Sequence, residues 1–172
     1  MSGTIVVRLL EPNDERAAFE SGNIELDRFF RLFAGQNQFR HHIGATYVAV
    51  DGGCILGFVT LSVGHIEIEE LPKNKRKKLP HYPLPILRLA RLAVDGSAQG
   101  RGVGRLLLAT VFQVAKDMAH SVGCIGVVVD AKREAIAFYE RYGFEFFQIM
   151  RGGLDSRPAP FPMFLPINAI PG

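Results

Sequence analysis

A glycine-rich turn is the part of this sequence whose residue types and spacing most clearly indicate chemistry. Three glycines stand two residues apart, after an apolar strand-like run and at the start of a long amphipathic helical pattern. Glycine tolerates positive φ and lets the backbone come close to a ligand, so successive amide N–H groups can point into one concavity. Backed by the positive end of a helix, such a turn predicts a phosphate or pyrophosphate site. The glycines are Gly100, Gly102 and Gly104.

The spacing of these glycines excludes two common phosphate-binding motifs. A dinucleotide fingerprint needs the pattern GxGxxG and an acidic residue about 20 positions further on. Counted from Gly100 the third glycine falls on Arg105, and counted from Gly102 it falls on Leu107. A Walker loop needs a glycine-lysine-serine/threonine sequence, which does not follow. The turn is therefore expected to hold another kind of phosphate-bearing ligand.

The turn lies within a predicted strand, helix and strand. Apolar patterns predict a central strand over 86–94, a helix over 104–122 and a buried strand over 124–129. Segments of these lengths predict a parallel, right-handed unit. Downstream, residues 133–142 predict a helix that ends at Gly143. The expected final elements are a strand over 144–147, a proline-rich loop, and a last edge strand over 163–165.

Before the turn, the sequence predicts a strand, an amphipathic helix and an antiparallel hairpin. The first strand covers 4–10, and Asn23 is well placed to cap a helix. The hairpin joins strands over 46–50 and 54–63 through Asp51-Gly52-Gly53, since aspartate and glycine tolerate positive φ. The apolar face of the helix is predicted to comprise Leu26, Phe29, Phe30 and Phe33.

Composition restricts the class of protein. The 172 residues, 48% hydrophobic and 22% charged, fit a single domain spanning 1–172 with one core. A net charge of +3 favours approach to phosphate-bearing partners. Cys54 and Cys124 lie in apolar runs without CxxC spacing or a nearby histidine pair, so we expect reduced core thiols and no metal site. Without a signal-peptide pattern or a membrane-length apolar run, a cytoplasmic location without membrane insertion is expected.

Two motifs together resemble the GNAT superfamily of acyl-CoA N-acyltransferases. The glycine turn, preceded by Leu92-Ala93-Val94-Asp95, resembles the family's pyrophosphate signature Q/R-x-x-G-x-G/A, and residues 135–144 resemble its second landmark, A-x-x-F-Y-x-x-x-G-F. The resemblance extends from the first strand to about Phe147. It implies an α/β fold with a central, mixed but mostly antiparallel sheet of six to seven strands. The sheet would splay at the acyl-CoA site and be flanked by about four helices.

The resemblance also implies acetyl-CoA as the cofactor and assigns residues to it. Backbone contacts with the pantetheine and thioester fall on Leu92, Ala93 and Val94. Lys132 stands where many members have an asparagine, so that residue's cofactor contact stays unassigned. The pyrophosphate would bind amide groups from about Arg101 to Arg105, with Gln99 opening the loop. The cofactor-binding residues of the turn are Gln99, Gly100, Arg101, Gly102, Val103, Gly104 and Arg105.

By the same resemblance, Tyr139 is the candidate proton donor to the departing thiolate. A phenol suits this role because it is neutral and protonated at pH 7. The alternative is that Tyr139 is only a packed aromatic side chain on an amphipathic helix. The general base stays open, and an α-amine with a pKa near 7.7–8.0 is already partly neutral without one.

Within the superfamily, the chain looks most like acetyltransferase toxins of bacterial toxin–antitoxin pairs. The similar stretches are residues 19–30, 34–38 and 82–85. This resemblance implies acetylation of the α-amino group of aminoacyl-tRNA, a block of translation, a homodimer and an antitoxin partner. The basic residues expected to attract tRNA phosphates are Lys73, Lys75, Arg76, Lys77, Lys78 and Arg91. The alternative for the lysine cluster is a solvated loop.

Two other functions stay open at this point. One is an acetyltransferase for a small-molecule amine or a protein N-terminus, which needs no basic rim. The other is a non-catalytic, acyl-CoA-binding regulatory module that acts through a protein partner. Retention of both the glycine turn and Tyr139 favours an enzyme.

Overall fold

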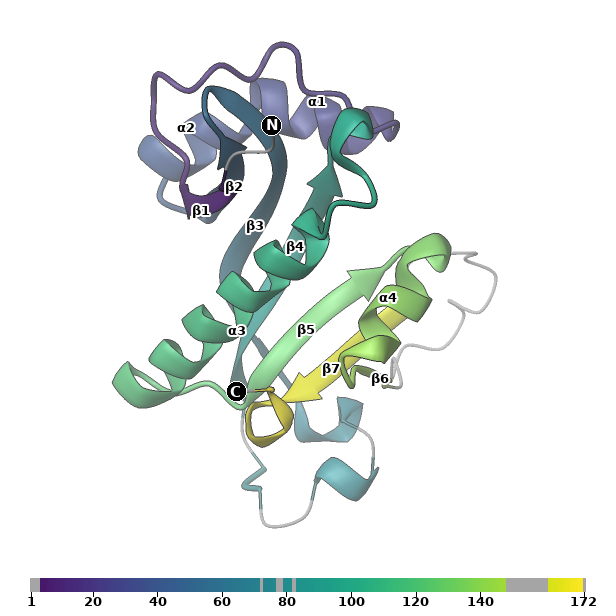
Figure 1. Ribbon diagram of the computed structural model, residues 1–172. Helices are drawn as coiled ribbons and strands as arrows, with labels where there is room; N and C mark the ends of the chain where they lie inside the picture. Colours follow the sequence, from purple (N-terminus) through teal and green to yellow (C-terminus); the bar gives the residue numbers. More distant parts are fainter. Residues whose placement is uncertain (1–3, 72, 77–78, 82, 148–160, 172) are drawn as a thin grey trace. The chain divides into compact units, whose positions relative to one another are not determined.

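The computed structural model describes residues 4–71, 73–76, 79–81, 83–147 and 161–171. Within these ranges seven strands form one sheet in the order β1-β2-β3-β4-β5-β7-β6 (Figure 1). The pairs β1–β2, β2–β3, β5–β7 and β6–β7 are antiparallel. A mostly antiparallel sheet with four helices confirms the predicted fold, and the predicted splay stays a prediction. The elements are β1 (Val6–Leu9), α1 (Ile24–Leu32), α2 (Ala34–Phe39), β2 (Ala45–Asp51), β3 (Cys54–Ile66), β4 (Leu84–Val94), α3 (Val103–Ser121), β5 (Gly126–Ala131), α4 (Ile136–Arg141), β6 (Glu145–Phe146) and β7 (Phe161–Pro166).

The chain folds as two compact units. Unit 1 comprises Met1–Ser62 and Leu89–Val111, and unit 2 comprises Val63–Arg88 and Phe112–Gly172. The glycine-rich turn, residues 99–105, therefore belongs to unit 1, and we call it the cofactor turn. Tyr139 belongs to unit 2. A single domain over 1–172 stays a prediction.

Local sequence signals explain how the elements of unit 1 begin and turn. Asn23 caps α1, because its side-chain Oδ1 accepts a hydrogen bond from the Leu26 N–H at 3.0 Å. In the hairpin, Asp51 pairs with Cys54 across Gly52-Gly53, and Gly52 has a φ of +63°. Both features confirm the predictions made from the sequence.

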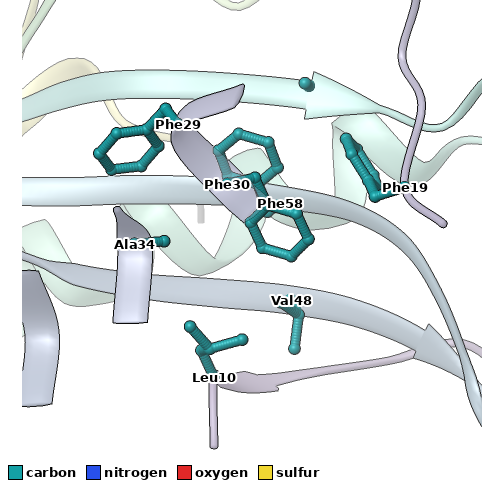
Figure 2. Close-up of a cluster of buried hydrophobic side chains, with 8 residues drawn as sticks. Leu10, Phe19, Phe29, Phe30, Ala34, Val48 and Phe58 are labelled. Atoms are coloured by element: carbon teal, nitrogen blue, oxygen red, sulfur yellow. The ribbon is translucent and has the colours of Figure 1, made fainter. Parts of the chain in front are cut away.

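Phenylalanine rings form the centre of unit 1 (Figure 2). The rings of Phe30 and Phe58 stack with centroids 4.4 Å apart, and Phe19 meets Phe30 edge to face at 4.9 Å. Phe29 belongs to the same cluster. Phe33 was predicted on this face, but it is 38% exposed. The prediction was wrong because α1 ends at Leu32 and Phe33 caps it, so the helical phase does not continue.

Unit 2 is organised around β7. The sequence predicted residues 163–165 as an edge strand, but β7 lies between β5 and β6 and is paired on both sides. The prediction was wrong because residues 163–165 are all apolar and buried, as in an interior strand, whereas an edge strand leaves one row of backbone N–H and C=O groups unpaired. The two-residue β6 lies at the end of the strand order instead. Gly143, with a φ of +98°, ends α4 as predicted.

The two cysteines differ in their surroundings. Cys124 is buried, as predicted, and burial raises the pKa of its thiol. Cys54 is exposed, so its prediction as a core thiol was wrong, because it opens β3 directly after the hairpin turn. No helix within the described ranges is long and apolar enough to cross a membrane.

Candidate functional site

The cofactor turn has the backbone geometry that its glycines predicted. Gly100 and Gly102 have φ angles of +83° and +77°, whereas Gly104 lies inside α3, which begins at Val103. A Cβ on Gly100 or Gly102 would meet no atom within 4 Å. These two glycines are therefore required for their backbone conformation and not for space. Alternating conformations of this kind turn successive N–H groups toward one side, as an anion nest requires.

The start of α3 suits an anion. The helix runs for 19 residues and has no acidic side chain in its first turn, so no carboxylate of its own competes for the N-terminal amides. Val103 is buried and anchors this end, while Arg105 is exposed. The first turn of α3 therefore combines N–H groups that have no partner within the helix with the positive end of the helix dipole.

The side chain of Arg101 already has a partner. Its guanidinium forms an ion pair with Asp51 of the β2–β3 hairpin, with Nη2 and Oδ2 3.2 Å apart. This pair fixes the turn against the hairpin at an exposed position. The backbone N–H of Arg101 also has a partner, since it donates to the carbonyl of Ala98 at 3.3 Å.

Gly57 of β3 belongs to the site, and sequence reasoning missed it. A Cβ at this position would lie 2.8 Å from Cγ1 of Val103 and 3.0 Å from the carbonyl oxygen of Ala93. Gly57 therefore lets β3 pass close to both the end of β4 and the first residue of α3. The available signal was a glycine inside an otherwise apolar strand, which often marks a close approach of backbones.

Tyr139 in unit 2 combines a buried ring with a free hydroxyl. It is 5% exposed, and its ring contacts Phe138 and Phe144 with centroids 5.2 and 5.3 Å away. Among the described residues, none hydrogen-bonds to its hydroxyl, and no fully buried side-chain oxygen or nitrogen lacks a partner. The hydroxyl therefore has no hydrogen-bond partner among the described residues, although the side chain is buried. Burial raises the pKa of Tyr139 above its ordinary value, so the hydroxyl holds its proton at neutral pH.

Arg91 of β4 borders a small cavity in unit 1. Its guanidinium carbon lies 3.8 Å from the ring centroid of Phe29, and burial lowers its pKa, although an arginine stays charged at pH 7. The cavity has a volume of about 150 Å³, and its walls include the hydroxyls of Thr46 and Thr60. These two hydroxyls hydrogen-bond to each other at 2.7 Å. Within the described ranges no carboxylate forms an ion pair with Arg91, so its charge is available to a ligand.

The basic cluster is less uniform than the sequence indicated. Lys73 is exposed, whereas Lys75 pairs with Glu145 at 3.7 Å. The guanidinium of Arg76 donates to the backbone carbonyls of Leu71 at 2.9 Å and of Glu69 at 2.7 Å. Arg76 therefore has a local structural role, whatever else it does. The two remaining predicted contacts, Lys77 and Lys78, lie outside the described residues.

Comparison with known proteins agrees with this geometry. A family model described as "Acetyltransferase (GNAT) domain" matches residues 42–146, which is more than half of the chain. The chain belongs to the GNAT acetyltransferase family. It is 34% identical over 148 residues to the "tRNA-acetylating toxin" of Mycobacterium tuberculosis, a match that covers 84% of this chain and 87% of the relative.

Two solved structures of GNAT proteins are also similar to this chain. "AtaT complexed with acetyl-methionyl-tRNAfMet" has a TM-score of 0.85 at 26% identity and covers 96% of both chains. "Crystal structure of AtaTR bound with AcCoA" has a TM-score of 0.77 at 28% identity and covers 96% of this chain and 95% of the other. As a GNAT acetyltransferase this protein is an enzyme that uses acetyl-CoA, and the resemblance predicted from the two motifs is confirmed.

Proposed function

We propose that this enzyme transfers the acetyl group of acetyl-CoA to the α-amino group of aminoacyl-tRNA and thereby blocks translation. The observation that carries the choice of acceptor is Arg91, which lies three positions before the end of β4 and borders a cavity. Its guanidinium is half-buried, and no carboxylate of the described residues forms an ion pair with it. The name of the Mycobacterium tuberculosis relative and the tRNA bound to AtaT support the same acceptor.

The environment of Arg91 favours the end of a nucleic acid over a small amine. A cationic acceptor would be repelled by a guanidinium, whereas an RNA 3′ end brings phosphates that bind guanidinium groups and bases that stack on guanidinium planes. The proposed tRNA contacts are Lys73, Lys75, Arg76, Lys77, Lys78 and Arg91. Of the described ones, Arg91 and Lys73 are the least engaged by other protein groups.

The cofactor site in this proposal is the end of β4 and the glycine turn. Leu92, Ala93 and Val94 offer backbone groups to the pantetheine arm, and residues 99–105 offer amides to the pyrophosphate. The positive φ angles of Gly100 and Gly102 and the acid-free start of α3 are what fit this group. Acetyl-CoA supplies the activated thioester, and the protein residues bind and orient it.

The proposed role of Tyr139 is to donate a proton as the thioester is cleaved. The acceptor nitrogen forms a bond to the carbonyl carbon, and the carbon–sulfur bond breaks. The thiolate sulfur receives the hydroxyl proton of Tyr139, and the proton lost by the amine goes to solvent, which reprotonates the phenolate. A neutral hydroxyl that no described residue engages in a hydrogen bond is suited to this donation.

No side chain is assigned as general base. An α-amino group has a pKa near 7.7–8.0, so a useful fraction of the acceptor is neutral at pH 7 to 8. Much of the rate enhancement is then expected to come from holding amine and thioester in reacting geometry. A homodimer, an antitoxin that masks the site, and a cytoplasmic location complete the proposal.

The proposal is tested by the choice of acceptor. The protein is incubated with labelled acetyl-CoA and with charged tRNA, uncharged tRNA or a panel of free amines including peptide N-termini. Label that enters charged tRNA, and that alkaline ester hydrolysis releases as N-acetyl amino acid, supports it. Label that enters only a small amine or peptide contradicts the tRNA acceptor. Acetyl-CoA binding without transfer to any acceptor would favour a non-catalytic module.

A further inference from the structure

A short segment, residues 19–23, connects the cofactor turn with helix α1, and we call it the tether. The N–H of Glu20 donates to Oδ1 of Asp95 at 2.9 Å, and the Glu20 carbonyl accepts from the N–H of Gly96 at 2.8 Å. One tether residue therefore forms two reciprocal hydrogen bonds with the first residues of the loop that leads to the glycines. A third contact joins the Gln99 side chain to the Ser21 carbonyl at 3.4 Å.

Asp95 holds the tether from the side of the cofactor turn. Besides Glu20, its carboxylate accepts from the N–H of Ser97 at 3.0 Å and from the Ser97 hydroxyl at 2.6 Å. Burial alone would raise the pKa of Asp95, but these hydrogen bonds outweigh burial and hold the pKa below its ordinary value. The charged carboxylate of Asp95 thus holds together Glu20 of the tether and Ser97, which precedes the cofactor turn.

Asp27 holds the tether from the side of α1. Its carboxylate accepts from the Ser21 N–H at 3.0 and 3.1 Å and from the Ser21 hydroxyl at 2.6 Å. Asp27 is only 4% exposed and, within the described ranges, has no ion-pair partner. A buried carboxylate without a counter-charge is costly, so its presence calls for a reason. Arg31 of the same helix also donates to the tether, at the Phe19 carbonyl.

We propose that Asp27 and Asp95 are positioning residues, which fix the tether between α1 and the cofactor turn and so hold the turn's amides in the arrangement that binds pyrophosphate. This inference rests on the proposed function, because it takes residues 99–105 as the acetyl-CoA site. Asp27 acts at a distance, through Ser21 and Glu20 to the loop at Asp95. Loosening either end lets the turn sample other conformations, and binding then has to restore the competent one.

Asp14 offers a matched control for a purely structural effect. It is a part-buried carboxylate of the same unit, and it accepts hydrogen bonds from Arg8 at 2.8 and 2.9 Å and from the Glu11 N–H at 2.7 Å. Within the described ranges, its hydrogen bonds and its ion pair involve neither the tether nor the cofactor turn. Asp14→Asn is therefore expected to lower the melting temperature without changing the affinity for acetyl-CoA.

The test compares the full chain with its Asp27→Asn, Asp95→Asn, double and Asp14→Asn variants. Calorimetry measures acetyl-CoA affinity, and transfer to charged tRNA gives KM and kcat. We expect Kd and KM for acetyl-CoA to rise about tenfold in each tether variant, with kcat at saturation near that of the wild type. The double variant should be little worse than the poorer single variant, since both release the same segment. The rise in Kd and KM for acetyl-CoA should be larger in Asp27→Ala than in Asp27→Asn, because the asparagine side chain keeps one hydrogen-bond acceptor.

Two further results separate the possible failures. If Asp27→Asn does not fold, Ser21→Ala removes one bond to the same carboxylate and should raise the KM for acetyl-CoA by a smaller factor. Unchanged affinity in all tether variants, with melting temperatures lowered as in Asp14→Asn, would overturn the positioning role. A wild-type protein that does not bind acetyl-CoA at all would instead overturn the proposed function.

Discussion

Arg91 and Phe29 form a stacked pair, with the guanidinium carbon 3.8 Å from the ring centroid. Phe29 is itself held against Phe58, with centroids 6.4 Å apart. The core of unit 1 therefore sets the plane of a guanidinium at the border of a cavity. A fixed plane matters because guanidinium recognises phosphates through paired N–H groups and stacks on bases, and lysine can do neither.

Replacing Arg91 is expected to weaken tRNA use and to leave acetyl-CoA binding intact. Loss of a charge-assisted contact of about 1.5–3 kcal/mol corresponds to a roughly 10- to 150-fold lower kcat/KM for charged tRNA. Arg91→Lys should recover only part of this loss, since the charge is kept but the plane is lost. Acetyl-CoA affinity, measured by calorimetry, serves as the internal control. Equal kcat/KM in wild type and Arg91→Ala would remove Arg91 from acceptor binding.

Tyr139→Phe is expected to reduce turnover by about 10²- to 10⁴-fold, the usual range for loss of a general acid. The ring and its packing against Phe138 and Phe144 are preserved, so acetyl-CoA affinity and melting temperature should stay close to wild type. Tyr142→Phe, one turn further along the chain, is the matched control and should retain activity. Near-normal turnover in Tyr139→Phe would leave this tyrosine a packing residue only.

The pH dependence follows from the raised pKa of Tyr139. Because the hydroxyl stays protonated beyond the ordinary tyrosine pKa of about 10, its ionisation cannot lower the rate below that pH. The acceptor amine loses its proton around pH 7.7–8.0, so kcat/KM should rise through this range and then stay level to about pH 10. A decline between pH 8 and 9.5 that disappears in Tyr139→Phe would contradict the raised pKa of Tyr139.

Gly57→Ala is expected to damage both stability and cofactor binding. The new Cβ would meet Val103 at 2.8 Å and a backbone carbonyl of Ala93 at 3.0 Å, and backbone cannot move aside cheaply. Overpacking of this kind costs about 1–3 kcal/mol and should displace the start of α3. Gly53→Ala, in the adjoining hairpin with no atom within 4 Å, is the control. Denaturant unfolding and acetyl-CoA calorimetry measure the two effects, and equal values for both variants would count against the role of Gly57.

Two members of the basic cluster are expected to behave differently. Lys73 is exposed and should contribute to tRNA affinity through phosphate attraction, so Lys73→Gln should reduce the salt dependence of binding by about one unit of slope. Arg76 donates to two backbone carbonyls, so Arg76→Gln should mainly lower stability. Salt titrations of tRNA binding and melting curves distinguish these outcomes. If the Lys73 variant keeps the full slope, Lys73 takes no part in tRNA binding.

Features encoded by neighbouring residues were predictable from the sequence. Asn23 caps α1, Gly52 turns the hairpin, and Gly100 and Gly102 adopt positive φ, because each depends on the conformational preference of the residue itself. The two motifs identified the family for the same reason, since each is a short pattern of glycine and aromatic residues. Phe33 marks the limit of this approach, because the periodicity did not reveal where the helix ends.

Features that join distant parts of the chain were not predictable. The interior position of β7 depends on two pairings, with β5 and with β6, that no local pattern specifies. The tether was missed because Glu20 meets Asp95 through its backbone, which any residue type can provide. From the sequence, Asp27 is an ordinary acidic residue in the first turn of a helix. Its burial and its hydrogen bonds with Ser21 are known only from the structure. The stack of Arg91 on Phe29 likewise joins segments far apart in sequence.

The interior position of β7 has a consequence for when the enzyme becomes active during its own synthesis. Among the described strands, β5 and β6 are joined in the sheet only through β7, so unit 2 cannot be completed before Phe161–Pro166 has left the ribosome. Tyr139 packs against Phe144 directly before β6, and this surrounding is unfinished in a shorter nascent chain. On this reasoning, no competent enzyme forms beside the ribosome until Phe161–Pro166 has been made and has left it. Messages that end early, before the codon for Phe161, yield chains without the proposed activity against translation.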